Sequence, residues 1–251
     1  MVTFANIKIY PSTLKESIKN VENYVKGNKY HYQISLNAGK VVEAQKDEKL
    51  LKIINNADIL NADGMPIKII IQLLFRKPTD RLGGLDYMDG LASKYPEYKY
   101  YFLGSTEDVV SKTVNHYRTK YNMNIVGWRN GFFKKNELLD VIDDINKKEA
   151  DVLFVALGTP AKEYFLYDNK DILKCKFAVG VGGAFNIIAG VSKRAPHWVQ
   201  KIGMEWFYRF IQEPRRMWYR YLVGNSKFIW LVIKENIIRR KKLDKYNNKL
   251  L

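Results

Sequence analysis

Up to about residue 192, short apolar runs alternate with longer amphipathic segments. The runs are rich in β-branched and aromatic residues, as buried strands are, and the longer segments repeat apolar residues at helical spacing. The runs predict strands at residues 32–36, 57–60, 99–103, 124–127, 151–157 and 176–181. The intervening segments predict helices, among them 14–25, 106–120, 136–149 and 161–173. This alternation predicts an α/β fold, with a Rossmann-like and mostly parallel sheet flanked by helices.

Beyond Arg194 the pattern changes to Trp, Tyr, Phe and Arg in short amphipathic stretches, which Pro196 and Pro214 interrupt. Three helices are expected there, at residues 204–212, 215–222 and 227–240. The change divides the chain into an α/β domain, residues 1–193, and a C-terminal appendage of basic amphipathic helices, residues 194–251.

The third of these helices carries an apolar stripe of Ile229, Trp230, Ile233 and Ile237 beside two lysines. A basic helix with an aromatic face is typical of an element that lies on a membrane surface. An ordinary helix that packs its apolar side on the core would show the same stripe, so the sequence leaves both interpretations open.

The charge of the chain indicates an anionic partner. Its 251 residues include 42 Lys and Arg against 26 Asp and Glu, a net charge of +16. From Arg194 onward, fourteen basic residues stand against four acidic ones, so ten of the sixteen excess charges lie in the appendage. Nucleic acid, anionic lipid or a phosphorylated substrate would each satisfy such a charge. A solvated basic tail explains the run at 239–242, but it does not explain the aromatic stretch before it.

Cysteine content and hydropathy bear on the location of the protein. The single cysteine, Cys175, can form no internal disulfide, which favours a reducing compartment. The N-terminus lacks a basic patch followed by a long apolar run, and no segment reaches about 18 uninterrupted apolar residues. We therefore expect a cytoplasmic protein that spans no membrane.

Several predicted strands run directly into glycine or small polar residues and then into a helix, in YYFLGSTEDVV, LFVALGTPAKEYF and FAVGVGGAFNIIAG. In open α/β sheets, ligands bind at the carboxyl ends of the strands, where helix N-termini offer N–H groups to phosphates. A nucleotide diphosphate would suit this edge, although a glycine after a strand is more often part of a turn. None of the segments fits G-x-G-x-x-G or the P-loop pattern, which argues against a dinucleotide enzyme or an ATPase.

Two charged residues stand at the ends of predicted strands or in glycine-flanked loops. Asp63 follows a strand and precedes Gly64 and Pro66, so its carboxylate is expected at the ligand-binding edge; the alternative is an ordinary helix N-cap. Arg81 lies in the loop DRLGGLD, where its guanidinium suits bidentate contact with a diphosphate; the alternative is a surface ion pair.

Three absences narrow the chemistry. No D-x-D motif occurs, so the usual two-carboxylate clamp for a metal-bound nucleotide sugar is missing. His31, His116 and His197 are far apart and have no companions at ligand spacing, which argues against a zinc site. There is no G-x-S-x-G elbow.

Together these motifs resemble the WecG/TagA/CpsF family of bacterial glycosyltransferases over about residues 35–222. The segments that carry the resemblance are SLNAGK (35–40), NADGMP (61–66), DRLGGLD (80–86), YFLGS (101–105), GWRNGFF (127–133), DVLFVALGTPAKE (151–163), VGVGGAFNIIAGVSKRAPHW (179–198) and MEWFYRFIQEPRRMWYRYL (204–222). Each segment is modest alone, but their order and spacing are highly specific.

The resemblance implies a fold of the GT-E type and an inverting glycosyltransferase. Its expected reaction moves a sugar from a UDP-sugar to undecaprenyl-diphosphate-linked N-acetylglucosamine, in cell-surface polysaccharide or teichoic acid synthesis. N-acetylmannosamine is the expected sugar, and N-acetylmannosaminuronic acid, glucose or another hexose are the alternatives. Asp63 matches the family's proposed general base, which would take the proton from the acceptor hydroxyl. Arg81 matches a residue expected to neutralise the departing diphosphate, so no metal ion and no cofactor are expected.

The resemblance also assigns further residues to the substrates. Those expected at the donor are Ser35, Asn37, Gly104, Gly158, Pro160, Glu163, Gly182, Gly183 and Asn186. Those expected at the lipid diphosphate and the anionic membrane surface are Arg194, Arg209, Arg215, Arg216 and Arg220. Anionic lipid attracts each basic residue near it by roughly 1 kcal/mol, so several together would hold the enzyme peripherally on the inner face of the cell membrane.

The chain departs from the family pattern at two turns. Family members usually show Pro-Lys-Gln-Glu where this chain has Pro160-Ala161-Lys162-Glu163, and an Asp where it has Asn186. Both turns are expected to face the ligand, so the departures put donor specificity in question.

Two other classes of protein fit parts of the sequence. A nucleic-acid-binding protein would explain the charge of +16, but no binding module is visible and the excess charge follows an α/β body, so we expect no nucleic-acid partner. A non-catalytic membrane scaffold would not need Asp63 and Arg81 in strand-end loops. The apolar helix faces leave both a monomer and a homo-oligomer open.

Overall fold

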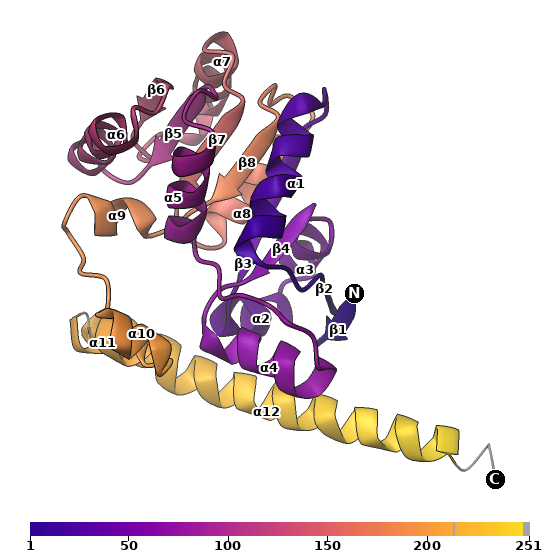
Figure 1. The fold of residues 1–251 in the computed structure, drawn as a ribbon. Coiled ribbons are helices and arrows are strands. Elements are labelled where there is room, and N and C mark those ends of the chain that lie inside the picture. The colour runs from indigo at the N-terminus through magenta and orange to yellow at the C-terminus, as the bar shows by residue number, and fades with distance from the viewer. Residues whose placement is uncertain (213, 248–251) are drawn as a thin grey trace.

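Six strands form a parallel sheet in the order β4-β3-β8-β7-β5-β6. The strands are β3 His31–Leu36, β4 Ile59–Ala62, β5 Tyr100–Gly104, β6 Ile125–Arg129, β7 Val152–Ala156 and β8 Phe177–Gly180. The computed structural model describes residues 1–212 and 214–247 (Figure 1). Each strand lies within two residues of its predicted bounds, so the predicted α/β class is confirmed.

Helices cover both faces of this sheet (Figure 1). One face carries α1 (Leu14–Lys26), α5 (Gly84–Lys94), α6 (Glu107–Tyr121) and α9 (Ala184–Ile188). The other carries α2 (Ala38–Ala44), α3 (Glu48–Asn55), α4 (Met65–Phe75), α7 (Leu138–Lys147), which follows the 3-10 turn Lys135–Glu137, and α8 (Ala161–Asp168). Two apolar cores result, one on each face, because a parallel sheet is buried on both sides.

The helix predicted at 161–173 ends earlier, at Asp168. The side-chain amide of Asn169 donates a hydrogen bond to the Phe165 carbonyl at 2.8 Å. The carbonyl of Asn169 then accepts from the backbone of Ile172 and Leu173, which turns the chain toward β8. Local hydrogen bonds of an Asn side chain compete with continuation of a helix, so this residue ends α8.

A hairpin that the sequence pattern did not predict precedes the sheet. Strands β1 (Val2–Phe4) and β2 (Ile7–Ile9) pair antiparallel. Both residues of the connecting turn have positive φ, 48° at Ala5 and 62° at Asn6, which is the backbone of a type I′ turn. Strands of three residues are too short to show alternation clearly, and alanine gives no turn signal at Ala5.

The appendage consists of α10 (His197–Lys201), α11 (Glu205–Gln212) and the 34-residue α12 (Pro214–Asn247). The two helices predicted at 215–222 and 227–240 are one continuous helix. The Gly224-Asn225-Ser226 sequence between them does not break it, because a glycine inside a helix costs only about 1 kcal/mol. No described helix combines the length and the apolar character needed to cross a membrane.

Helix α12 packs against α2 along the lower edge of the body (Figure 1). Phe228 is its buried anchor, 5% exposed, and its ring meets Phe4 edge-on at 5.9 Å. The apolar stripe predicted on this helix does not face the α/β body, because Ile229, Trp230 and Ile233 are each more than half exposed. That stripe therefore does not pack on the core, and a neighbouring face of the helix does.

Candidate functional site

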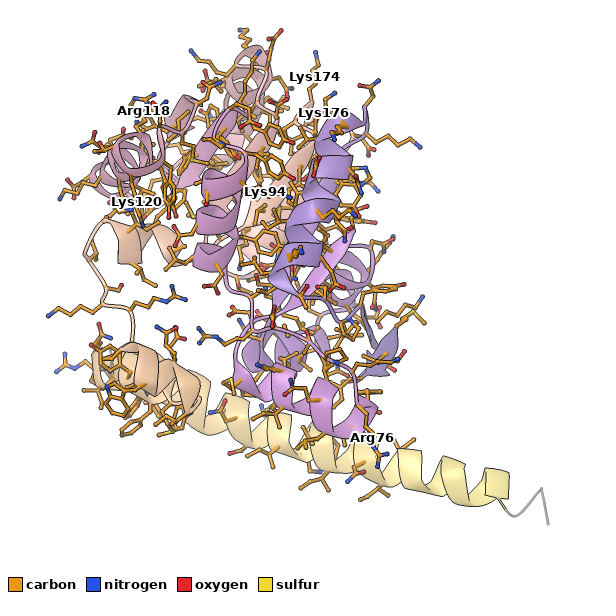
Figure 2. All side chains as sticks on the ribbon, in the orientation of Figure 1. Arg76, Lys94, Arg118, Lys120, Lys174 and Lys176 are labelled. Carbon is orange, nitrogen blue, oxygen red and sulfur yellow. The ribbon has the colours of Figure 1, made fainter. Side chains whose placement is uncertain are left out.

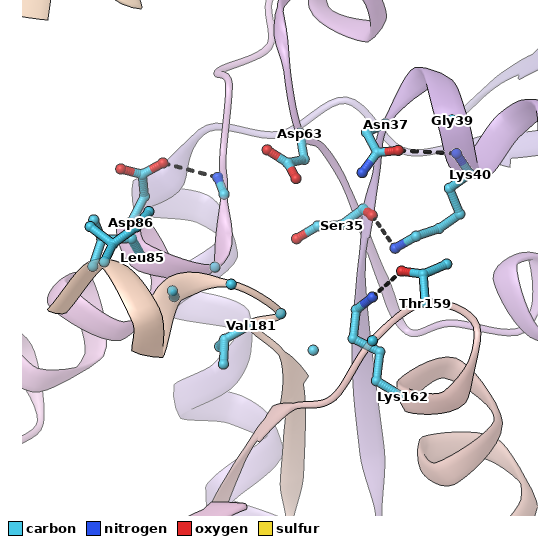
Figure 3. Close-up of a pocket in the computed structure, with 18 of the residues that line it drawn as sticks. Ser35, Asn37, Gly39, Lys40, Asp63, Leu85, Asp86, Thr159, Lys162 and Val181 are labelled. Atoms are coloured by element: carbon cyan, nitrogen blue, oxygen red, sulfur yellow. Dashed lines mark hydrogen bonds between the residues drawn. The ribbon is translucent and has the colours of Figure 1, made fainter. Parts of the chain in front are cut away.

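A cleft of about 440 Å³ opens at the carboxyl ends of β3, β8 and β7 (Figure 3). The turns after these strands form its floor, the segment after β4 and the N-terminus of α5 form one side, and the appendage contributes to the wall. Its lining includes Ser35, Asn37, Gly39, Lys40, Glu43, Asp63, Arg81, Gly83, Gly84, Asp86, Gly158, Thr159, Lys162, Gly180, Gly182, Gly183, Arg194 and Glu205. This cleft thus lies at the sheet edge where the sequence predicts a ligand to bind.

Asp63 projects its carboxylate into this cleft (Figure 3). The N-cap position of α4 belongs to Gly64, at φ 92°, so the N-cap alternative for Asp63 does not hold. The backbone of Asp63 donates to the Leu36 carbonyl at 2.8 Å, which fixes it beside the end of β3. A side chain at Gly83 would begin 3.4 Å from Oδ1 of Asp63, so the glycine loop lies directly across from the carboxylate.

Arg81 lies in the wall between the α/β body and the appendage. It forms an ion pair with Glu205, and its Nη2 donates to Oε1 of Gln200 at 2.9 Å. Both charged side chains are less than one-fifth exposed, so this is a part-buried pair and not the surface pair considered above. Arg194, which precedes α10, forms a second ion pair of this kind, with Asp86 of α5 at 2.8 Å. Two arginine contacts therefore join the segment after residue 193 to the cleft.

Ser35 and Asn37 are held at the end of β3. The hydroxyl of Ser35 is buried and accepts from Nε2 of Gln33 at 2.9 Å. The same amide nitrogen donates to Asn61 at 3.1 Å, so a polar network supports this corner of the cleft. Asn37 caps α2 by accepting from the backbone of Lys40 at 3.0 Å, which places both Asn37 and Lys40 on the lining.

Two lysines share one glutamate under the floor of the cleft. Oε1 of Glu163 lies 2.7 Å from Nζ of Lys40 and 2.8 Å from Nζ of Lys162. All three side chains are almost fully buried. Burial alone would raise the pKa of Glu163, but the two ammonium groups outweigh burial and lower it. Burial, and then repulsion by Lys40, lower the pKa of Lys162 to about 8.

The remaining residues expected at the donor fall into two groups. Gly158, Gly182 and Gly183 line the cleft, whereas Gly104, Pro160, Glu163 and Asn186 do not. A side chain at Gly104 would begin 2.6 Å from the backbone of Ala156, so close strand packing explains this glycine. Asn186 accepts a hydrogen bond from the Ser105 hydroxyl at 2.9 Å, which directs it to the turn after β5.

The arginines of the appendage are only partly described. Arg194 lines the cleft, and Arg215 is exposed near the start of α12. The side chains of Arg209, Arg216 and Arg220 lie outside the described part of the structure. Among the residues that are described, no group of three or more His, Cys, Asp or Glu side chains could hold a metal ion.

Sequence reasoning missed Lys40 as a lining residue and missed that Lys40 and Lys162 share Glu163, although the turn that contains Lys162 is one of the two expected to face the ligand. Each lysine lies in the first turn of a helix, α2 after β3 and α8 after β7. Strand β8 lies between β3 and β7, so both helices begin beside its glycine turn. The signal was a lysine soon after each strand, but the strand order that brings the two together cannot be deduced from the pattern.

A second cavity of about 160 Å³ adjoins the first. Asn37, Gly39, Asp63, Arg81 and Glu205 line both. The smaller cavity continues toward the appendage and is lined there by Met65, Pro66, Trp206 and Asn225. Asp63 thus stands where a polar cleft meets a more apolar passage.

Comparisons with known proteins give matches over nearly the whole chain. Residues 2–242 match the family model described as the glycosyl transferase WecG/TagA/CpsF family. The chain is 29% identical over 238 residues to an N-acetylglucosaminyldiphosphoundecaprenol N-acetyl-beta-D-mannosaminyltransferase of Bacillus subtilis strain 168, covering 93% of this chain and 91% of the relative. It is 27% identical over 227 residues to a protein of the same name from Bacillus spizizenii strain W23, covering 89% and 87%.

Proposed function

Because the chain belongs to the WecG/TagA/CpsF family of glycosyltransferases, we propose that it transfers N-acetylmannosamine from UDP to undecaprenyl-diphosphate-linked N-acetylglucosamine. The names of the two Bacillus relatives support this sugar and this acceptor. The donor binds in the larger cleft, with its diphosphate at the glycine turns after β7 and β8. The acceptor enters through the smaller cavity beside the appendage.

The position of Asp63 carries this proposal. Its carboxylate is shared by the two cavities, so it lies between a donor in one and an acceptor in the other. In that place it takes the proton from the acceptor hydroxyl as the oxygen attacks the anomeric carbon. Attack from the face opposite UDP inverts the configuration at that carbon.

Two arginine side chains stabilise the negative charge that develops on the departing UDP. Arg81 and Arg194 both line the cleft, as does the glycine loop at 83–84. Charged donors fixed before the reaction stabilise developing negative charge without reorganisation, which is the role a metal ion plays elsewhere. The proposed transfer accordingly needs no metal ion.

The acceptor is a membrane lipid, and the surface of the appendage suits a membrane. Large apolar side chains are exposed on α10, α11 and α12, and Figure 2 shows side chains that project from α12 away from the sheet. They include Trp198, Ile202, Phe207, Ile211, Trp218, Ile229, Trp230, Ile233 and Ile237. Lys227 and Lys234 are exposed on the same helix as the last four of these residues. We propose peripheral attachment of this surface to the inner face of the cell membrane.

A transfer assay with EDTA tests the function directly. It uses UDP-N-acetylmannosamine and a short-chain lipid-diphosphate-N-acetylglucosamine, and we expect product with an inverted anomeric configuration. Asp63→Asn should lower turnover by about 10²- to 10⁴-fold, the range typical of a lost general base, while binding of UDP persists. Asp143→Asn is the matched control, because this aspartate is exposed on α7 and pairs with Lys147. Full transfer by Asp63→Asn would refute the role of the base, and a strict magnesium requirement would refute metal independence.

A further inference from the structure

The cluster of Lys40, Glu163 and Lys162 has no role in the reaction as described above. Its side chains are 2%, 1% and 8% exposed, and one carboxylate serves two ammonium groups. An ion pair buried in this way normally balances its charges, because an uncompensated buried charge is costly. The three side chains by themselves carry one positive charge more than they balance, and the carboxylate of Asp63 in the cleft also attracts Lys162.

The other described cations of the lining have a carboxylate of their own. Arg81 pairs with Glu205, and Arg194 pairs with Asp86. Lys40 lies deeper than Lys162 and also donates to the Ser35 carbonyl at 2.5 Å. The surplus charge is thus presented to the cleft by Lys162.

The structure leaves room for a ligand beside Lys162. Its stem lies over the glycine turn of β8, where a side chain at Gly180 would begin 3.3 Å from its Cδ. A side chain at Gly182 would begin 4.0 Å from its Cε. The ammonium group reaches the cleft beside Thr159, to which it donates a hydrogen bond (Figure 3). Glycines at these positions keep the space next to the ammonium group open.

We propose that Lys162 binds an anionic oxygen of the donor, from its diphosphate or from a carboxylate on its sugar, and so determines which donors the cleft accepts. Lys40 and Glu163 are positioning residues that hold the ammonium group in place. The inference rests on the proposed function and deepens it. It also explains why this chain has a lysine at a position where members of the family usually have an uncharged Gln.

Calorimetric titration tests the proposal with UDP, UDP-N-acetylmannosamine and UDP-N-acetylmannosaminuronate. In Lys162→Gln, all three should bind about tenfold or more weakly if the diphosphate is the source of the anion. Only the uronate should weaken if the sugar carboxylate is the source. Lys174→Gln, a change at an exposed lysine at the far end of the sheet (Figure 2), should keep the wild-type Kd for all three ligands.

The outcomes separate this inference from the function on which it rests. Wild-type affinity of Lys162→Gln for all three ligands overturns the role of Lys162. A wild-type protein that binds none of them contradicts the proposed function instead. The variant should fold, because it leaves Lys40 and Glu163 as a one-to-one pair, and its melting temperature checks this.

A second measurement follows proton uptake in the wild-type protein and in Lys162→Gln. Lys40 on α2, Glu163 on α8 and Asp63 after β4 face Lys162, and the pKa of its ammonium group is lowered to about 8. At about pH 8.5, roughly three-quarters of a group with that pKa is neutral, and an anion beside it raises the pKa. Binding of UDP-N-acetylmannosamine should therefore take up protons, which titrations in two buffers of different ionisation enthalpy measure. The uptake should be absent in Lys162→Gln, and the same uptake in that variant would overturn the proposal.

Discussion

Arg81 and Glu205 lie 124 positions apart in the chain, and their side chains form an ion pair in the wall of the cleft. The first belongs to the glycine-flanked loop after α4, and the second begins α11. The pair connects the orientation of a guanidinium in the cleft to the placement of the appendage. The docked appendage therefore fixes the position of Arg81 in the wall of the cleft.

Glu205→Gln should lower kcat/KM by about tenfold. The change removes the charge that orients Arg81, and a hydrogen bond to a charged group contributes about 1.5–3 kcal/mol. Transfer kinetics at saturating acceptor measure the effect. Glu149→Gln is the control, because Glu149 is 76% exposed and pairs with Lys99 away from the cleft. Unchanged kcat/KM in Glu205→Gln would show that Arg81 needs no such partner.

Removal of the chain after residue 193 should abolish turnover and leave a folded α/β body. The truncation deletes Glu205, Gln200 and Arg194, whereas the sheet and the helices on both of its faces remain. Circular dichroism and the transfer assay measure the two effects separately. Loss of the α/β signal, or turnover by the truncated chain, would contradict the division into a catalytic domain, 1–193, and an appendage.

Phe228→Ala should destabilise the full-length protein by about 3–5 kcal/mol, as large-to-small changes at buried aromatic residues do. Phe228 is 5% exposed against Phe4, so its loss leaves a cavity between α12 and the N-terminal hairpin. Chemical denaturation measures the free energy of unfolding. Trp230→Ala is the matched control, since Trp230 is 59% exposed and should change stability little. Equal losses of stability in the two variants would mean that α12 packs on the body with a different face.

The sheet could be predicted because its strands are short runs rich in β-branched, aromatic and other apolar residues, most clearly Val152–Ala156 and Phe177–Gly180, and local sequence reports such runs directly. Asp63 and Arg81 could be found for a similar reason, since each lies in a loop that follows a recognisable element. The pairing of Arg81 with Glu205 could not, because it depends on how the appendage docks. The cluster of Lys40, Glu163 and Lys162 depends on the strand order β3-β8-β7, which local patterns do not encode.

Cys175 should resist alkylation in the folded protein. Burial raises the pKa of its thiol to about 12, so at about pH 8 only about one thiol in ten thousand is a thiolate, the form that reacts. Iodoacetamide labelling followed by mass spectrometry should show protection in buffer and rapid labelling in denaturant. Rapid labelling of the folded protein would mean that the thiol is not enclosed by the core on which β8 packs.

Ile233→Glu should weaken binding to vesicles of phosphatidylglycerol and phosphatidylcholine. Ile233 is 54% exposed on the face of α12 that carries Trp230, so a carboxylate there opposes insertion of an apolar side chain and repels anionic lipid. Co-sedimentation should show a loss of about fivefold or more, equivalent to roughly 1 kcal/mol for each charge altered near the surface. Ile172→Glu introduces the same charge at a residue that is 45% exposed in the segment between α8 and β8, and should bind vesicles as the wild type does. If both variants bind equally well, the exposed face of α12 is not the membrane contact, and the apolar side chains of α10 and α11 become the surface to test.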